Sequence, residues 1–377
     1  MNEARSTEAA LTIAFVVEQH LGHRTYAENL ARAMAAMPGV QATWIPVRYE
    51  HDVPWSRWLP SEQLRAVLRG RAEVHTGLRR AARDVTVFNT QVPAVISGRI
   101  ARRAPYVLCA DVTPIQYDRM AAGYDHRADR PGPGRWVKYR WNRSVFQRAA
   151  AHAPWSSWVR DSLVQDYGVE PGRIAVIPPG VDTTQWQPAQ PVGDGVMRIL
   201  FVGGDFERKG GDLLMRAVAS LPTGSYELHV VTRSDVPRRD GVVVHHGLNQ
   251  NDPELRRLFA RSDVFVLPSH AETFGIAAVE GAAAGLPLVL SSIGGLADLV
   301  VDGVTGFAVP PGDGDALAIA LRRLLDAPDL RRTMGHAARE RATREFDATT
   351  NARRLVHLCA SCAGLTDHPA PVGGAAR

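Results

Sequence analysis

Short apolar runs alternate with longer amphipathic segments through the first half of the chain. The amphipathic segments repeat apolar residues at helical spacing, as Leu30, Met34 and Met37 do after a turn predicted at Gly22. Strands that alternate with helices are typical of a parallel α/β sheet. The predicted strands are 11–17, 43–46, 85–88 and 106–109, and the predicted helices are 23–37, 62–83 and 135–151.

A second α/β series follows a stretch in which prolines and glycines cluster and the periodicity lapses, from about 177 to 195. Its regular rhythm predicts a second parallel sheet of Rossmann-like type. The predicted strands are 198–202, 227–232, 242–245, 264–268 and 288–291, and the predicted helices are 211–220, 252–261, 274–284, 313–325 and 349–363.

Composition narrows the class of protein. With 377 residues, 45% of them hydrophobic and 22% charged, the chain is ordinary for a folded protein and near the size at which chains divide into two domains. No apolar run reaches the ~18 residues of a membrane-spanning helix. Three cysteines make no disulfide framework, and the first nine residues are polar, unlike a signal peptide. We therefore expect a cytoplasmic protein.

Charge and aromatic residues are distributed unevenly. Residues 1–190 carry a net charge of +7 and residues 191–377 one of −2, which together give the +5 of the whole chain. All eight tryptophans lie before residue 187. No nucleic-acid-binding motif accompanies the basic half, so we expect no nucleic acid partner. The split suggests two domains with different ligands.

The segment 269–287 carries the strongest chemical signal. A strand ends at Pro268, and a helix is predicted from Phe274, so the amides of Phe274, Gly275 and Ile276 would form an anion site at its N-terminus. Glu272 precedes this helix and Glu280 lies within it, eight residues further on. Carboxylates at this spacing could bind the hydroxyls at the two ends of an extended phosphorylated ligand. The alternative is that Glu272 caps the helix and Glu280 is a solvated acid.

A glycine-rich loop follows the first strand of the second series. It contains Gly203, Gly204, Arg208 and Lys209, and it matches neither the dinucleotide-binding fingerprint nor the Walker A motif. Only two of the 44 basic residues are lysines, Lys138 and Lys209. A compact ammonium group suits a phosphate oxygen in a tight loop. The alternative is a solvent-exposed pair of charges.

These two segments resemble the C-terminal domain of retaining glycosyltransferases of the GT-B fold, family 4 (group 1), over about 11–346. The resemblance implies two Rossmann-like domains facing across a cleft, with a C-terminal helix that crosses back to the first. It implies that Glu280 binds the nucleotide ribose, that Glu272 binds the transferred sugar, and that Lys209 and Arg208 neutralise the diphosphate. The amides of 274–276 would hold phosphate or sugar, and Gly247 and Leu248 would meet the base. The family carries an arginine where this chain has Gly204, and Arg208 is the expected substitute.

The same resemblance places the acceptor in the first domain. Its candidate residues are Gly22, His20 and His23 after the first strand and Gln116 after the fourth, and Asp111, also after the fourth strand, is a candidate catalytic residue. Asp111 takes the place of a histidine that touches the donor sugar in many relatives. We expect domains at 1–184 and 185–348, a crossover helix at 349–364 and a flexible tail at 365–377.

Two weaker patterns have simpler alternatives. Cys359 and Cys362, with His357 and His368, only partly match zinc-ligand spacing, so no metal site is predicted. The basic and aromatic segment 135–143 could touch an anionic membrane peripherally, although a surface helix with arginines extended into solvent explains it equally well.

The resemblance thus implies a metal-independent transferase that moves a hexose from a UDP- or GDP-sugar to an acceptor hydroxyl with retention of configuration. No cofactor is expected besides this donor substrate. The acceptor, a saccharide, a lipid-linked sugar or a small molecule, stays open. A nucleotide-sugar epimerase of the same fold and a catalytically silent sugar-nucleotide binding protein remain alternatives.

Overall fold

The computed structural model describes residues 10–365 except 20, 52, 54–57, 60, 187, 189–194 and 251. The chain forms two compact units. The first contains the chain up to Ile115, Asp129–Pro178 and the chain from Thr349 onward, and the second contains Gln116–Ala128 and Pro179–Ala348. These ranges differ from the expected ones in two places, because 179–184 and the excursion Gln116–Ala128 both belong to the second unit.

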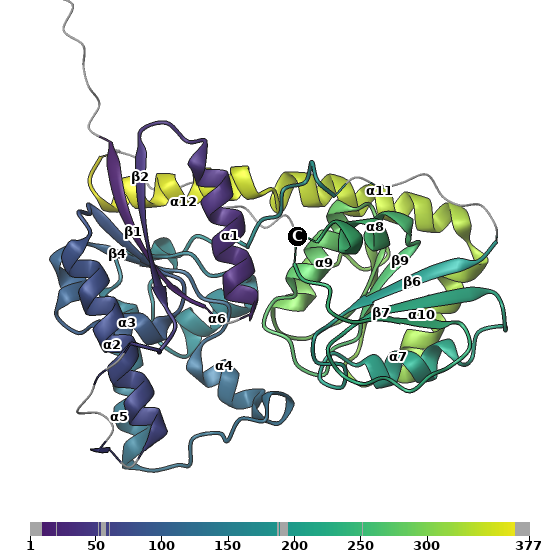
Figure 1. Ribbon diagram of the computed structural model, residues 1–377, viewed down its shortest axis with the longest axis horizontal. Helices are drawn as coiled ribbons and strands as arrows, with labels where there is room; N and C mark the ends of the chain where they lie inside the picture. Colours follow the sequence, from purple (N-terminus) through teal and green to yellow (C-terminus); the bar gives the residue numbers. More distant parts are fainter. Residues whose placement is uncertain are drawn as a thin grey trace, which may run out of the picture. The chain divides into compact units, whose positions relative to one another are not determined.

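The first unit is built on a parallel sheet with the strand order β2-β1-β3-β4-β5. β1 lies between β2 and β3 and is almost entirely buried, which explains its continuous apolar sequence. Figure 1 shows these strands with helices packed around them. Their bounds are β1 Leu11–Glu18, β2 Val40–Val47, β3 Val85–Phe88, β4 Tyr106–Leu108 and β5 Ala151–His152.

Most helices of the first unit lie between these strands along the chain, whereas α6 follows β5 and α12 follows the second unit. Ser61 and Ser156 cap α2 and α6 by accepting a hydrogen bond from the amide three residues on. Their bounds are α1 Leu21–Ala35, α2 Glu62–Arg80, α3 Gln91–Ser97, α5 Pro133–Arg148, α6 Ser157–Gln165 and α12 Ala348–Cys362, with 3₁₀ turns at Ile100–Arg103 and Pro171–Arg173.

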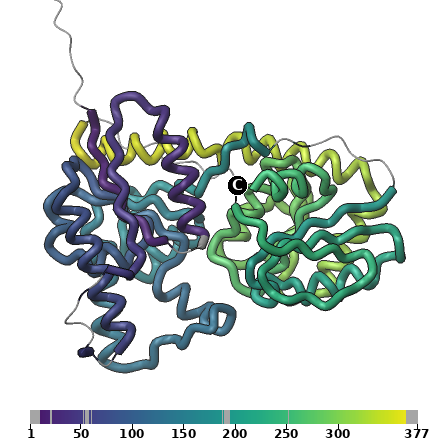
Figure 2. Tube along the Cα trace, viewed as in Figure 1, coloured from purple at the N-terminus to yellow at the C-terminus, as the bar shows by residue number. Residues whose placement is uncertain are grey.

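The C-terminal helix α12 returns to the first unit. Asn351 Nδ2 donates to the carbonyl of Pro178 (3.1 Å) and Arg354 Nη2 to that of Val176 (2.7 Å). Figure 2 traces how the early strands, in purple, and this late helix, in yellow, belong to one unit although they are far apart in sequence.

The second unit contains a parallel sheet with the order β11-β10-β9-β6-β7-β8. The chain builds outward from β6 through β7 to β8, then returns to β9 and builds outward on the other side. Strand order therefore reverses between β6 and β9, and open α/β sheets bind ligands at the carboxyl ends of strands at such a point. The bounds are β6 Met197–Val202, β7 Tyr226–Val231, β8 Val242–His245, β9 Val264–Leu267, β10 Leu288–Ser291 and β11 Gly306–Val309.

Three strands or α-helices of the second unit were not predicted: β11, the short helix α4 and the long helix α11. α11 buries the small and flexible residues Met334, Gly335, Ala338 and Ala342 rather than a stripe of large apolar ones. The helices are α4 Pro114–Arg119, which begins at the edge of the first unit, and α7 Gly211–Val218, α8 Pro253–Arg261, α9 Ile276–Ala283, α10 Gly314–Asp326 and α11 Pro328–Glu345, with 3₁₀ turns at Ala121–Tyr124 and Gly294–Leu299. Among the described residues, no helix is both long and apolar enough to cross a bilayer.

Candidate functional site

The two segments with the strongest sequence signals lie beside each other at the switch point. The loop after β6 and the loop after β9 follow neighbouring strands, which pair through Ile199 with Val264 and Leu200 with Phe265. The amide of His270 donates to the carbonyl of Arg208 (2.9 Å), so the loops are joined by their backbones. The site is therefore built from two chain segments about 60 residues apart.

Lys209 and Glu272 form an ion pair across these loops. Their side chains are only 16% and 7% exposed, and Glu272 Oε1 also accepts from the amide of Thr273 (3.2 Å). Each charge is thus largely removed from water and compensated by the other. The ammonium group has three donors and can bind an additional anionic oxygen while it remains bound to Glu272.

Glu280, unlike Glu272, has no counter-ion among the described residues. Its side chain is buried at 5% exposure, so it is not the solvated helix acid of the alternative explanation. Burial raises the pKa of this carboxyl to about 8, because removal from water disfavours the charged form. Among the described residues, no side chain or amide donates a hydrogen bond to its carboxyl oxygens. A buried carboxyl without a donor is costly, and a ligand with adjacent hydroxyls would supply the missing donors.

The helix that carries Glu280 begins later than predicted. α9 starts at Ile276, with Gly275 as its N-cap at φ +97°. A Cβ on Gly275 would be strained at this φ and would lie 2.7 Å from Leu296 Cδ1. The Phe274 side chain is buried at 1% exposure. The amides that open the helix are therefore those of Gly275 and Ile276, where the backbone turns into α9.

The glycine-rich loop holds its cations in different ways. Gly203 continues the sheet, since its amide donates to the carbonyl of Val231 (2.9 Å), and the stem of Lys209 packs against it. Arg208 is engaged by the protein: Nη1 donates to the carbonyl of Ala271 (2.9 Å) and Nε to Asp205 Oδ2 (3.2 Å). Gly204 is exposed.

Gly247 and Leu248 lie in the loop after β8, at the same carboxyl edge of the sheet but two strands from β6. Gly247 is exposed at φ +77°, and its carbonyl accepts from Asn249 Nδ2 (3.3 Å). Leu248 is half-buried. This loop offers backbone groups and one apolar side chain.

In the first unit the structure pairs two predicted candidates. His23 Nε2 lies 3.5 Å from Asp111 Oδ1, and both side chains are less than 15% exposed. The imidazole packs on Trp155, with the ring centres 5.1 Å apart, and its Nδ1 is buried without a partner among the described residues. His23 is therefore not a surface histidine.

The other residues predicted on the acceptor side are Gly22, His20 and Gln116. Gly22 lies inside the first turn of α1, so the turn predicted there is wrong and the helix already begins at Leu21. His20 lies outside the described residues. Gln116 is buried at 2% exposure in α4 and falls in the second unit, whereas His23 and Asp111 fall in the first.

Sequence reasoning missed Glu18, the last residue of β1. It is buried at 7% exposure and accepts hydrogen bonds from the hydroxyls of Tyr49 and Thr90. Burial and the neighbouring carboxylate raise the pKa of Tyr49. An acid that ends an otherwise apolar strand was the available signal.

The cysteines of α12 are packed into the first unit. Cys359 is fully buried and Cys362 is half-buried, and burial raises the pKa of both thiols. Their sequence partner His368 lies outside the described residues. Across the part of the chain that the structure describes, no three His, Cys, Asp or Glu side chains gather as metal ligands would.

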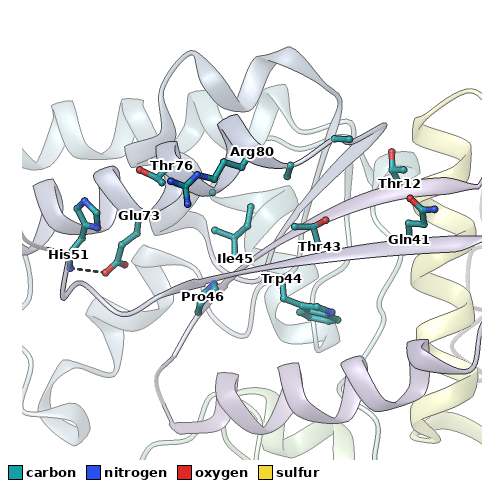
Figure 3. A pocket seen from close by; sticks show the side chains of 13 residues that line it. Thr12, Gln41, Thr43, Trp44, Ile45, Pro46, His51, Glu73, Thr76 and Arg80 are labelled. Carbon is teal, nitrogen blue, oxygen red and sulfur yellow. Dashed lines mark hydrogen bonds between the residues drawn. The ribbon is translucent and has the colours of Figure 1, made fainter.

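A cavity of about 440 Å³ lies along the edge strand β2 and helix α2 of the first unit (Figure 3). Glu73 lines it and accepts the amide of His51 (3.0 Å), and Trp44 and Arg80 also line it. None of the predicted site residues contributes to this cavity.

Two protein-family models match the chain, one in each half. The model for "Glycosyltransferase Family 4" matches residues 22–185, and that for "Glycosyl transferases group 1" matches residues 182–341. A glycogen synthase of Mycobacterium tuberculosis is 34% identical over 219 residues, 54% of this chain and 53% of the relative. A D-inositol 3-phosphate glycosyltransferase of Kribbella flavida is 33% identical over 208 residues, 48% of this chain and 49% of the relative. The chain thus matches about half the length of these relatives.

Solved structures match nearly the whole chain. A sucrose-phosphate synthase of Thermosynechococcus elongatus superposes with a TM-score of 0.75 at 20% identity, covering 94% of this chain and 100% of that one. Anabaena HepE, solved in complex with UDP and glucose, superposes with a TM-score of 0.67 at 16% identity, covering 93% and 100%. The two family models meet near residue 182 and together extend from 22 to 341, and the chain belongs to the group 1 glycosyltransferases, with the two parallel-sheet, Rossmann-like domains of the GT-B fold.

Proposed function

We propose that this protein transfers a hexose from a UDP- or GDP-sugar to an acceptor hydroxyl, with retention of anomeric configuration. Family membership supports transfer of a sugar, and the complex of HepE with UDP and glucose supports a nucleotide-sugar donor. The observation that carries the proposal is the site at the switch point, where the Lys209–Glu272 pair lies at the strand end that precedes α9, the helix of buried Glu280.

Lys209 and Glu272 would act on either side of the bond between sugar and diphosphate, Lys209 on the diphosphate and Glu272 on the sugar. As the bond from the anomeric carbon to the phosphate oxygen lengthens, negative charge grows on the diphosphate, and the Lys209 ammonium group stabilises it. Glu272 accepts hydrogen bonds from hydroxyls of the transferred sugar. Glu272 is already engaged by Lys209 and by the amide of Thr273, so we assign it no role as a nucleophile.

Glu280 would hold the nucleoside. Its carboxyl is buried and has no donor among the described residues, and two adjacent ribose hydroxyls match an ionised carboxylate. The amides of Gly275 and Ile276 open the same helix and would hold a phosphate or sugar oxygen. One short helix would then position both parts of the donor.

We further propose that neutralisation of the leaving group depends on protein cations and amides rather than on a divalent metal ion. The acceptor oxygen forms the new bond to the anomeric carbon, and its proton passes to the leaving phosphate oxygen. The acceptor is assigned to the first unit, where His23 and Asp111 form a polar pair after β1 and β4. Activity should then persist in excess EDTA.

The test is release of nucleoside diphosphate from a panel of UDP- and GDP-sugars, with and without acceptors. The names of the relatives make glycogen and D-inositol 3-phosphate the first acceptors to try. Acceptor-dependent release in which the product keeps the anomeric configuration of the donor supports the proposal. Isomerisation without an acceptor would show an epimerase, and binding without turnover would show a silent binding protein.

A matched pair of lysine variants tests the site itself. Lys138 is the other lysine in the chain, and it lies in the first unit, paired with Asp129 (2.7 Å). Lys138→Ala should keep full turnover, whereas Lys209→Ala should lose it. Because Lys209→Ala leaves Glu272 buried without its counter-ion, the double variant Lys209→Met/Glu272→Gln separates lost stability from lost chemistry. It should recover the melting temperature and remain inactive.

A further inference from the structure

The loop after β6 carries Gly204 at the position where the resemblance leads us to expect an arginine. Arg208 was the expected substitute, but its guanidinium is engaged elsewhere. It donates to the carbonyl of Ala271 and to Asp205, and its Cζ lies 4.7 Å from the centre of the Tyr124 ring. Arg208 therefore links the loops after β6 and β9 to the excursion Gln116–Ala128 within the second unit. This is a structural role.

A different arginine occupies the space beside Gly204. Arg233 is the second residue after β7, the strand next to β6. A Cβ built on Gly204 would lie 3.0 Å from both Nε and Nη2 of Arg233 and 3.3 Å from its Cζ. The guanidinium thus lies against the backbone of Gly204, and the absence of a side chain at 204 makes this approach possible.

The turn that carries Arg233 is fastened to the same loop. The amide of Phe206 donates to Ser234 Oγ (3.2 Å), and the amide of Ser234 donates to Thr232 Oγ1 (3.2 Å). The amide of Thr232 donates to the carbonyl of His245 (3.2 Å). The residue after Arg233 is therefore tied to the loop of Gly204, and the residue before it is tied to the end of β8.

Arg233 differs from the other two cations at this loop because both of those have an acidic partner. Lys209 is paired with Glu272 and Arg208 with Asp205. Within the described chain, Arg233 makes neither a hydrogen bond nor an ion pair, and its side chain is exposed. An uncompensated guanidinium at the carboxyl end of a strand beside the switch point has its full set of donors available for a bidentate contact with phosphate.

We propose that Arg233 binds the diphosphate of the donor over Gly204 and that Arg208 does not contact the donor. This inference rests on the proposed function, because the phosphate is that of the nucleoside diphosphate. The resemblance implies a cation in the loop after β6, and here the turn after the neighbouring strand β7 would supply it.

Calorimetric binding of UDP, GDP, UMP and uridine tests the proposal. Arg233→Ala should weaken binding of the diphosphate on the order of 10- to 100-fold and leave uridine binding unchanged. Arg238→Ala removes the same charge from an exposed position on the same β7–β8 connection and should bind like the wild type. Equal diphosphate affinity in the two variants would overturn the proposal.

Relocation of the guanidinium distinguishes a binding role from a structural one. Gly204→Arg alone places two guanidinium groups in one space and should bind the diphosphate poorly. The double variant Gly204→Arg/Arg233→Ala should recover most of the affinity, which a purely structural Arg233 would not allow. If the wild type binds neither UDP nor GDP, the proposed function and this inference both fail. If it binds and the double variant does not recover, only the inference fails.

Discussion

Replacement of the buried Glu280 by glutamine should stabilise the protein, and the gain should grow with pH. Burial holds the pKa of this carboxyl at about 8 in the folded chain, against 4.5 for an unperturbed group. Between these two values the unfolded chain has lost the proton that the folded chain keeps, so stability falls as pH rises. The loss of stability from the buried carboxyl is absent below pH 4.5, and it reaches its full size once the pH exceeds about 8. Glutamine has nearly the same shape and carries no charge at any pH.

The magnitude follows from the two pKa values. A difference of one pKa unit corresponds to ~1.4 kcal/mol, so the rise from 4.5 to about 8 implies a cost on the order of 5 kcal/mol. That is a large fraction of the net stability of a typical domain. Glu280→Gln should therefore gain little at pH 5 and most of this amount at pH 8.5.

Denaturant unfolding monitored by circular dichroism from pH 5 to 9 measures the effect. Glu207→Gln, at an exposed carboxylate in the same unit, controls for the change in net charge. Parallel pH dependence in Glu280→Gln and the wild type would refute the reasoning. Ligand binding provides a second readout: ribose hydroxyls favour the ionised carboxylate, so binding of UDP at pH 7 should release protons. Calorimetry in buffers of different ionisation enthalpy should detect this release, and Glu280→Gln should abolish it.

Three further outcomes follow from the site. Lys209→Ala should lower kcat on the order of 100- to 1000-fold in a steady-state assay of diphosphate release, while Lys138→Ala leaves it unchanged. Gly275→Ala forces a side chain into a φ of +97° and should cost about 1–3 kcal/mol, seen as a melting temperature lower by several degrees. His23→Ala should raise KM for the acceptor without changing the affinity for UDP, and a change confined to UDP affinity would contradict the assignment of the acceptor to the first unit.

The local pattern of apolar residues was sufficient to predict most strands of the two sheets. The strands Val85–Phe88, Val242–His245 and Leu288–Ser291 have the predicted bounds, because each is a short β-rich apolar run. Helix α11 was missed because it buries small residues, which give no apolar stripe. Gly22 suggested a turn, yet α1 already includes it.

The two loops of the candidate site could be found in the sequence, but the contact between them could not. Both loops could be found because each follows an apolar strand, and a strand end with charged and glycine residues is a local signal. The contact between Lys209 and Glu272 depends on β6 lying beside β9, which the order of strands along the chain does not reveal. The approach of Arg233 to Gly204 likewise depends on two neighbouring turns, and no local motif marks it.

In the proposed function, this chain moves a sugar from a nucleoside diphosphate to a hydroxyl through the site at the β6–β9 switch point. The most direct measurement follows a ¹³C-labelled hexose from UDP- and GDP-sugars by mass spectrometry in the presence of the acceptor panel. We expect label covalently attached to an acceptor, one nucleoside diphosphate released per sugar transferred, and neither product with Lys209→Met/Glu272→Gln. Label that reaches an acceptor at the same rate in this double variant would contradict it.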